Sequence, residues 1–209
     1  MVWWRSTWGA GPVQVHPDGC MDLIWAGETV VVAGPDTRTH LAALSTRAGE
    51  PRPVTGVRLP PGVLPALLAV PAHELTDLRV PLADVRPDLA SRLRAPSDLR
   101  SLAAIPIQPW VRPTVAALAR GAPVALVADR LGISERQLHR RALAAFGYGP
   151  RTLQTLLRAA RAMDLLRDGT ALADAAAAAG YADYSHMFRD LRRITGCGPA
   201  AFRPGQSGA

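Results

Sequence analysis

The feature that most constrains the fold is a helix–glycine–helix pattern that occurs twice in the second half of the sequence. The first copy reads ALVADRLGISERQLHRR and the second reads LADAAAAAGYADYSHMFRDLRR. The glycines at the two breaks, Gly132 and Gly180, are 48 residues apart. Residues 150–169 have continuous helical periodicity and connect the copies. The pattern therefore predicts two helix-turn-helix units joined by a long helix.

The predicted helices have the end residues that helices favour. Pro123 begins the helix before the first break, and Ser134 is the expected N-cap of the helix after it. Gln137, three residues further on, completes a capping box with Ser134. In the second copy, Asp183 has the same N-cap position. We therefore expect the second half to be all-α.

The second helix of each unit has an apolar stripe and a polar face. The stripes consist of Leu138, Ala142, Ala145 and Phe146 in the first copy, and Met187, Leu191 and Ile194 in the second. The polar faces carry Arg136, His139 and Arg140, and then Tyr184, Ser185, His186 and Arg189. On an isolated helix such a face is usually just solvated surface. A helix-turn-helix, however, holds its second helix outward, where arginine can donate two hydrogen bonds to guanine in the major groove.

Charge is divided unevenly between the two halves. The formal net charge is +7 at pH 7, and every one of the 24 basic residues is arginine. Residues 1–105 contain 10 Arg and 10 acidic residues, whereas residues 106–209 contain 14 Arg and 7 acidic residues. A genomic preference for Arg explains the missing Lys but not this asymmetry. The basic half therefore indicates a polyanionic partner, which is usually nucleic acid.

Residues 110–203 resemble the DNA-binding domain of the AraC/XylS family of transcription regulators. The first unit, the segment FGYGPRTLQTLLRAARAMDLL and the segment LADAAAAAGYADYSHMFRDLRRITGCGPAAFR carry the resemblance. It implies a sequence-specific regulator that binds double-stranded DNA and is cytoplasmic and associated with the nucleoid. A monomer or a homodimer is expected, with RNA polymerase as a further partner if the protein is an activator.

The resemblance also implies roles for individual side chains. Contacts to bases are expected from Arg136, His139, Arg140, Tyr184, Ser185, His186 and Arg189. Contacts to phosphates are expected from Ser134, Arg141, Arg151, Arg192 and Arg193. Because both units are on one chain, one monomer is expected to address two successive segments of the major groove.

Three residues depart from the family pattern. Ala142 replaces a phenylalanine, which makes the first core smaller, and Gly198 replaces a Thr or Ser that caps the last helix. Phe188 stands at an outward position that is commonly small and polar. For Phe188 we expect contact with a thymine methyl group, a partner surface or the linking helix.

The first half has strand patterns separated by Pro and Gly. CMDLIW and TVVVA, separated by Ala-Gly-Glu, predict a hairpin, and THLAALS and PVTGVRL are further strand candidates. Short helices are expected over residues 61–75 and 82–95. We place the boundary near residue 105. The prediction is an α+β chain with a β-rich domain over 1–105 and an all-α domain with two helix-turn-helix units over 106–209.

The first half also resembles an uncharacterised domain found at the N-terminus of a subset of these regulators. Related regulators often bind a small effector in a β-rich first domain. Candidate pocket residues are Trp3, Trp4, Trp8 and Trp25, although such residues are more often core. His16, Asp18, Cys20 and His40 form the one metal-like set. Turn chemistry explains Pro17-Asp18-Gly19 without a metal, so we expect neither metal nor cofactor.

Several other classes of protein are disfavoured. No apolar run approaches the roughly 18–20 residues of a membrane span. The opening segment MVWWRSTWGAGP has no export signal. The two cysteines, Cys20 and Cys197, are far apart and have no CxxC spacing, which argues against a disulfide framework.

Three hypotheses about function follow. The first is a sequence-specific regulator whose first domain senses a small molecule. The second is a DNA-binding regulator whose first domain only dimerises or docks a partner, which the short chain favours. The third is an enzyme tethered to DNA, and no catalytic set of residues supports it.

Overall fold

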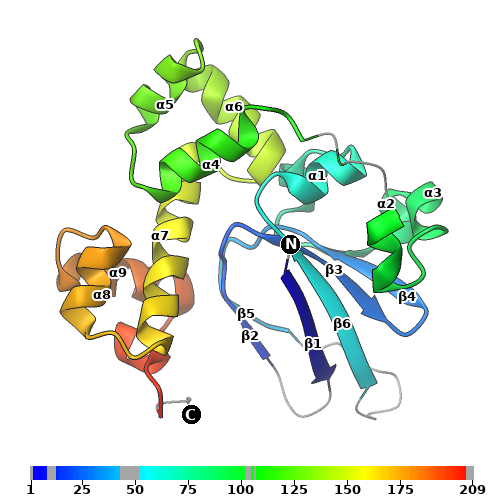
Figure 1. Ribbon diagram of the computed structural model, residues 1–209, viewed down its shortest axis with the longest axis horizontal. Helices are drawn as coiled ribbons and strands as arrows, with labels where there is room; N and C mark the ends of the chain where they lie inside the picture. Colours follow the sequence, from blue (N-terminus) through cyan, green and yellow to red (C-terminus); the bar gives the residue numbers. More distant parts are fainter. Residues whose placement is uncertain (1, 9–12, 43–51, 102–104, 106, 206–209) are drawn as a thin grey trace.

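The computed structural model describes residues 2–8, 13–42, 52–101, 105 and 107–205. Figure 1 shows a β-sheet with short helices formed by the first half of the chain and an all-helical second half beside it. The predicted α+β fold class is thus confirmed. Within the described residues, no helix is both long enough and apolar enough for a membrane crossing.

The main sheet has five strands in the order β1-β6-β3-β4-β7, and all neighbours are antiparallel. The strands are β1 (Val2–Trp8), β3 (Met21–Ala26), β4 (Thr29–Ala33), β6 (Arg52–Leu59) and β7 (Arg79–Pro81). A second sheet pairs β2 (Val13–Val15) with β5 (His40–Ala42). The predicted hairpin is present, with Ala26 opposite Thr29 and Gly27 in the turn between β3 and β4.

Short helices cover one face of the main sheet. They are α1 (Val63–Leu68), η1 (Ala72–Leu75), α2 (Leu82–Val85), α3 (Pro87–Ala90) and η2 (Pro96–Ser101). The single helix expected over residues 82–95 was wrong. Arg86 has φ −146° and ψ 81°, which divides the segment into α2 and α3. The cause is local, because the ring of Pro87 disfavours helical backbone at the preceding residue.

The helical half is built around one long helix. Its elements are α4 (Val111–Ala119), α5 (Val124–Arg130), α6 (Glu135–Phe146), α7 (Pro150–Arg167), α8 (Leu172–Ala179), α9 (Tyr184–Thr195) and η3 (Pro199–Phe202). Buried side chains run the length of α7, from Leu153 to Leu166. Helix α7 links the α5–α6 pair at one end to the α8–α9 pair at the other (Figure 1). This arrangement is the predicted pair of helix-turn-helix units.

Helices α6 and α9 are repeats of one another at an offset of 49 residues. Both have 12 residues, and their N-caps are Ser134 and Asp183. Both end at a glycine with left-handed backbone, Gly147 at φ 79° and Gly196 at φ 77°. Each position on α6 therefore has a defined counterpart on α9.

The two halves pack against each other at the C-terminal ends of α6 and α9. Beyond α6, the Tyr148 hydroxyl donates to the carbonyl of Asp36. At the end of α9, the carbonyl of Ile194 accepts hydrogen bonds from both the backbone N–H and the hydroxyl of Thr39, at 3.3 and 3.2 Å. The last carbonyls of a helix have no partner within it, so Thr39 supplies part of the C-terminal cap of α9.

Candidate nucleic-acid interface

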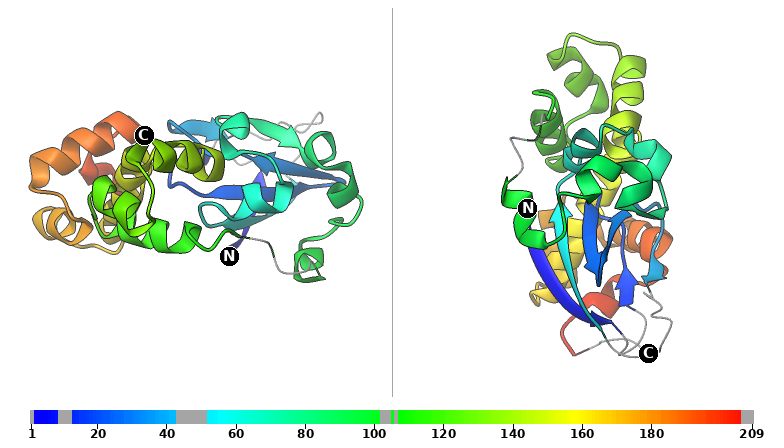
Figure 2. Two further views of the ribbon diagram at one scale, coloured as in Figure 1. Left: turned by 90° about the horizontal axis from the view of Figure 1, so that it is seen from above. Right: turned by 90° about the vertical axis from the view of Figure 1, so that its right-hand side faces the viewer.

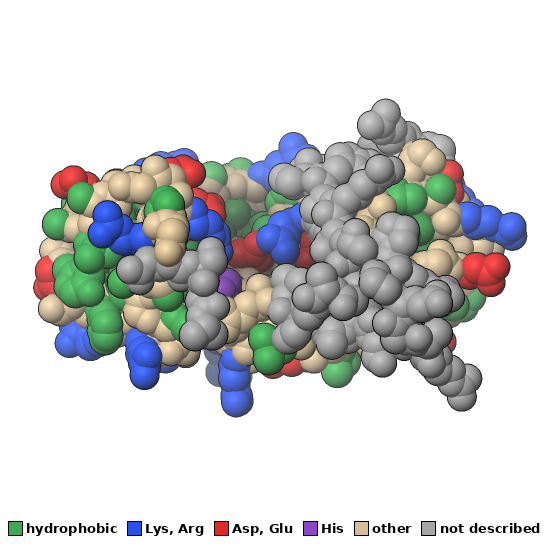
Figure 3. All heavy atoms as spheres, turned by 90° about the horizontal axis from the view of Figure 1, so that it is seen from below, with side chains coloured by type: hydrophobic (Ala, Val, Ile, Leu, Met, Phe, Trp, Pro, Cys, Tyr) green, Lys and Arg blue, Asp and Glu red, His purple; other side chains and the backbone are tan. Residues whose placement is uncertain are grey.

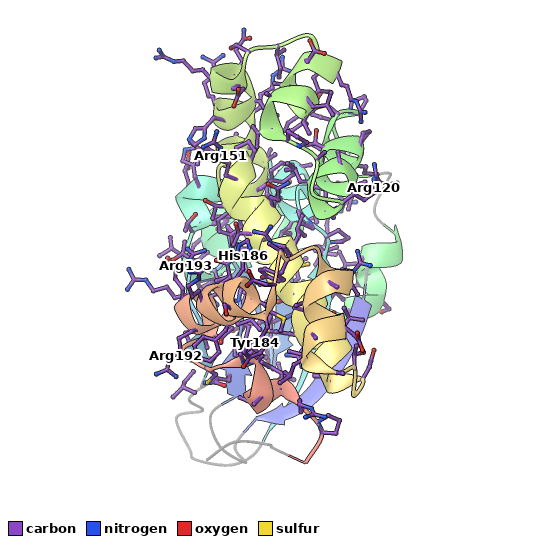
Figure 4. The ribbon with its side chains drawn as sticks, turned by 90° about the vertical axis from the view of Figure 1, so that its left-hand side faces the viewer. Arg120, Arg151, Tyr184, His186, Arg192 and Arg193 are labelled. Atoms are coloured by element: carbon purple, nitrogen blue, oxygen red, sulfur yellow. The ribbon has the colours of Figure 1, made fainter. Side chains whose placement is uncertain are left out.

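Helices α6 and α9 lie on the same side of α7. Figure 2 (left) and Figure 4 agree on this, and both place α5 and α8 on the other side. In the second unit the first helix, α8, packs against α7. In the first unit α5 packs against α4 and α6, and α4 and α6 pack against α7. The side of the molecule that carries α6 and α9 is therefore the candidate interface.

In the first unit, Arg136, His139 and Arg140 are all exposed on α6. The opposite face is buried through Leu138, Ala142 and Phe146, so the predicted division between core and surface is confirmed. The His139 ring lies over Gly149, where an added Cβ would be 2.6 Å from its Cε1 atom. The absence of a side chain at residue 149 thus leaves room for His139.

Ser134 forms the predicted capping box at the start of α6. Its Oγ accepts from the Gln137 backbone N–H at 3.2 Å, and its own N–H donates to Gln137 Oε1 at 2.9 Å. The hydroxyl therefore already has a partner within the helix. A phosphate contact from Ser134 stays a prediction.

In the second unit, Tyr184, Ser185 and Arg189 are exposed on α9, while Met187, Leu191 and Ile194 are buried. His186 differs from the expectation that it faces away from the protein. It is half-buried, its ring lies edge-on to Tyr181 with 5.1 Å between centroids, and its Nε2 is 3.8 Å from Asp190 Oδ2. A successive residue on a helix is rotated by about 100°, which turns His186 to the flank of the helix rather than to its outer face.

Phe188 was left out of the base-reading set predicted from the sequence, although a thymine methyl group was one of three contacts expected for it. At the 49-residue offset it is the counterpart of His139, just as Ser185 is the counterpart of Arg136 and Arg189 of Arg140. The N-caps and terminal glycines were visible in the sequence, so aligning the two helices from their ends would have found it. Its side chain is 40% exposed.

The arginines expected at phosphates are Arg141, Arg151, Arg192 and Arg193, and all are exposed. Figure 4 shows Arg151, Arg192 and Arg193 on the same side of the molecule, with Arg120 on the opposite side. Figure 3 shows that basic side chains are spaced around the helical half and that hydrophobic side chains gather at its outer end. The basic surface is therefore distributed along the units.

Asp190 balances part of this charge. Arg193 Nη2 is 3.3 Å from Asp190 Oδ1, and Arg158 Nη2 is 3.4 Å from Asp190 Oδ2. The Arg158 guanidinium also lies over the Tyr181 ring, 4.7 Å from its centroid. Burial, reinforced by Asp190, raises the pKa of Tyr181 to about 12. Arg193 is 66% exposed, and exposed ion pairs contribute little, so Arg193 is free to exchange Asp190 for another anion.

Residues singled out in the first half are only partly described. Trp3, Trp4 and Trp8 lie on β1, and their side chains are outside the described part of the structure. Trp25 is buried in the core over the sheet, and its indole N–H donates to the Leu93 carbonyl at 3.1 Å. Trp25 thus has a structural role, and a pocket lined by the tryptophans stays a prediction.

The metal-like set is not brought together. Among the described residues, no three His, Cys, Asp or Glu side chains are grouped so as to hold a metal ion. Asp18 and Asp22 instead pair with Arg58, at 3.1 and 3.3 Å. Burial, with Asp18 nearby, raises the pKa of the Cys20 thiol, which therefore stays protonated and unreactive.

A groove of about 270 Å³ lies where the two halves meet. It is lined by Gln14, Arg38, Thr39, His40, Leu41, Arg193, Ile194, Thr195 and Gly196. These residues come from β2, the approach to β5, β5 itself and the end of α9. The groove therefore adjoins the C-terminus of the second exposed helix and includes two arginines.

Comparison with known proteins identifies the helical half. Residues 127–205 match the model of a family described as a helix-turn-helix domain, and this domain is of the AraC type. The chain therefore contains an AraC-type helix-turn-helix domain in its second half. Residues 1–81 match a second family, described as a domain of unknown function. A search of curated proteins found no significant match.

Solved structures of the regulator ToxT from Vibrio cholerae have a similar fold. One is 12% identical to this chain, with a TM-score of 0.53, and the match covers 98% of this chain and 100% of the ToxT chain. Another, with ToxT bound to (E)-4-(8-methylnaphthalen-1-yl)but-3-enoic acid, is 11% identical with a TM-score of 0.51 and covers 97% and 98%. The similarity to ToxT is one of two-domain fold, and the helix-turn-helix domain supports DNA binding.

Proposed function

We propose that this protein binds a specific DNA sequence by inserting α6 and α9 into successive segments of the major groove. The observation that carries the proposal is the repetition of one capped, 12-residue helix on one side of α7. Each copy buries its apolar stripe and exposes arginine, Arg136 and Arg140 on α6 and Arg189 on α9. Guanidinium groups at those positions suit guanine, whose O6 and N7 accept two hydrogen bonds.

The proposal divides the side chains by role. Arg136, His139 and Arg140 read bases in one segment, and Ser185 and Arg189 read bases in the next. Arg141, Arg151, Arg192 and Arg193 bind phosphates, which position the protein without reading sequence. In this arrangement residues 106–209 are the DNA-binding domain and residues 1–105 the controlling domain, and the protein acts at the nucleoid.

The test is selection of duplexes with a randomised centre by the full chain. We expect enrichment of one asymmetric pattern with two conserved segments about one helical turn apart. Failure to enrich any sequence over several rounds would contradict sequence-specific binding. Enrichment of a single short segment would contradict the use of both helices.

We further propose that a small carboxylic acid controls DNA binding from the groove between the two halves. Arg38 and Arg193 line this groove, and arginine forms planar paired hydrogen bonds with carboxylates. Its volume is slightly below the ~300–1,000 Å³ of typical ligand pockets. The groove adjoins Ile194 and Gly196 at the end of α9, so an occupant would bear directly on that helix. The acid bound to ToxT belongs to the same chemical class.

A thermal-shift measurement with the arylbutenoic acid tests this second proposal. We expect the melting temperature to rise with acid concentration in the wild type and to rise less in Arg38→Ala. Arg120→Ala, which removes an arginine on the opposite side of the molecule, is the control (Figure 4). No shift in the wild type, together with a dimer in sedimentation, would favour the alternative that the first half only dimerises.

A further inference from the structure

Two aromatic side chains lie exposed beside each other on α9. Tyr184 is 39% exposed and Phe188 is 40% exposed, and their ring centroids are 6.1 Å apart. The other large hydrophobic side chains exposed among the described residues are Leu41, Leu78 and Leu126, and none of them is on α9. An exposed aromatic pair adds no core packing, so its place on the outer face of α9 calls for a contact outside the chain.

The repeat places Phe188 among the reading positions. Its counterpart on α6 is His139, which lies between the counterparts of Ser185 and Arg189. The polar row Arg136, His139 and Arg140 on the first helix thus becomes Ser185, Phe188 and Arg189 on the second. The change at the middle position replaces a hydrogen-bonding ring with an apolar one.

Gly198 fixes the position of the Phe188 ring. A Cβ at residue 198 would lie 3.0 Å from Phe188 Cε2 and 3.6 Å from Cδ2, so the ring rests against a backbone that has no side chain. The Tyr184 ring also lies beside it, tilted by 48°. A side chain that is already held loses less conformational entropy on binding. The two departures from the family pattern, Phe188 and Gly198, are therefore parts of one local arrangement.

We propose that Phe188, flanked by Tyr184, reads thymine by apolar contact with its C5-methyl group. In the major groove this methyl group is the apolar feature that distinguishes an A·T pair. The second unit then selects a segment that contains thymine, whereas the arginines of the first unit select guanine. The inference rests on the proposed function, because it needs α9 in the groove.

The surroundings of the pair favour DNA over an apolar protein surface. Arg189 and Arg192 flank Phe188 on the exposed face of α9, and Ser185 lies one turn before Arg189. A protein partner that covered the aromatic pair would have to desolvate these arginines and pair them. DNA offers a partner to both kinds of side chain: a methyl group in the groove for the aromatic pair and phosphates at the edge of the groove for the arginines.

The test replaces deoxythymidine by deoxyuridine in the duplex that the full chain selects. This change removes only the C5-methyl group and keeps every hydrogen-bonding group. For the wild type we expect about a fourfold loss of affinity for each contacted methyl in the segment read by α9. For Phe188→Ala we expect the two duplexes to bind equally. The segment read by α9 is the one whose preference Arg140→Ala leaves unchanged.

Two further variants sharpen the test. Leu126→Ala, which truncates a side chain of 40% exposure on α5, should respond to deoxyuridine as the wild type does. Gly198→Ser should displace the Phe188 ring and reduce the difference in affinity between the thymine and uracil duplexes. Affinity for the deoxyuridine duplex should stay unchanged. Circular dichroism melts of all variants establish that each is folded.

The possible outcomes separate this inference from the proposed function. If no sequence is selected, sequence-specific binding itself fails. If a sequence is selected but the wild type binds thymine and uracil duplexes equally, the methyl contact is wrong and the function stands. If Phe188→Ala alters transcription in a reconstituted assay but not DNA affinity, the aromatic pair binds a protein and the inference is overturned.

Discussion

At the scale of single residues, the exposed arginines of α6 and α9 have different targets on DNA in our proposal. We predict that Arg140→Ala costs about 1–3 kcal/mol of binding free energy on the selected duplex and relaxes the preference at one base pair. Arg193→Ala should instead weaken binding to all duplexes alike. It should also reduce the slope of log binding constant against log salt concentration by about 1. Fluorescence anisotropy at several salt concentrations measures both. Equal losses on every sequence would contradict the division of roles.

His16 connects the first half to the end of α9. Its Nδ1 is 2.7 Å from Thr39 Oγ1, which donates to the Ile194 carbonyl, so the neutral ring donates to the hydroxyl. The ring lies edge-on to Phe202. Burial lowers the pKa of His16, and Arg167 lowers it further. The second proton, which would charge this ring, is therefore disfavoured in the folded state.

This lowered pKa predicts how stability depends on pH. The unfolded chain takes up the proton near pH 6.5, whereas the folded protein takes it up only at lower pH. The His16 contribution is thus fully present above about pH 6.5 and is lost as pH falls toward the folded pKa. Urea unfolding at pH 7.5 and 5.5 should show a larger loss in the wild type than in His16→Asn. If the free energy of unfolding falls equally in both proteins, protonation of His16 does not contribute to the pH dependence of stability.

At the scale of elements, the two helix-ending glycines form a matched pair. Gly147 and Gly196 have nearly the same left-handed φ, so alanine at either costs about 1–2 kcal/mol from backbone strain. A Cβ at Gly147 would also lie 2.4 Å from Pro35 Cγ, whereas at Gly196 it would meet nothing within 4 Å. We predict that Gly147→Ala lowers the free energy of unfolding more than Gly196→Ala does. Similar losses in chemical denaturation would show that the first half does not press on α6.

How far the sequence predicted these elements depends on the range of the interactions. The capping box of Ser134 and Gln137 was predictable because it is local. The break before Pro87 was also local, and the weak helical pattern around it hid the signal. The hydrogen bond from Thr39 to Ile194 was not predictable, because tertiary packing brings together these two groups, which are 155 residues apart in the sequence.

At the scale of the whole molecule, α7 sets the distance between the two reading helices. Because both units are on one chain, we expect an asymmetric site with two segments about one helical turn apart to bind without a second protomer. We predict that inserting about 5 base pairs between the selected segments rotates one onto the opposite face of the DNA and reduces affinity to that of a single segment. Unchanged affinity in a mobility-shift titration would mean that the two units do not bind together.

The first half contacts the ends of both exposed helices, and these contacts are the route by which the proposed control of DNA binding would act. It presses Pro35 on Gly147 after α6 and caps α9 through Thr39. The excess of arginine in the second half and the repeated helix pattern predicted the DNA-binding half. Neither contains information about how the first half packs against it. The groove between the halves therefore emerged only from the structure.

The most direct test of the account is the preference of the full chain for its selected duplex. Fluorescence anisotropy would compare that duplex with a scrambled one of equal length and composition at physiological salt. The account predicts at least about a thousandfold tighter binding to the selected duplex. Equal dissociation constants for the two duplexes would contradict it, because arginines that bind only phosphates cannot tell them apart.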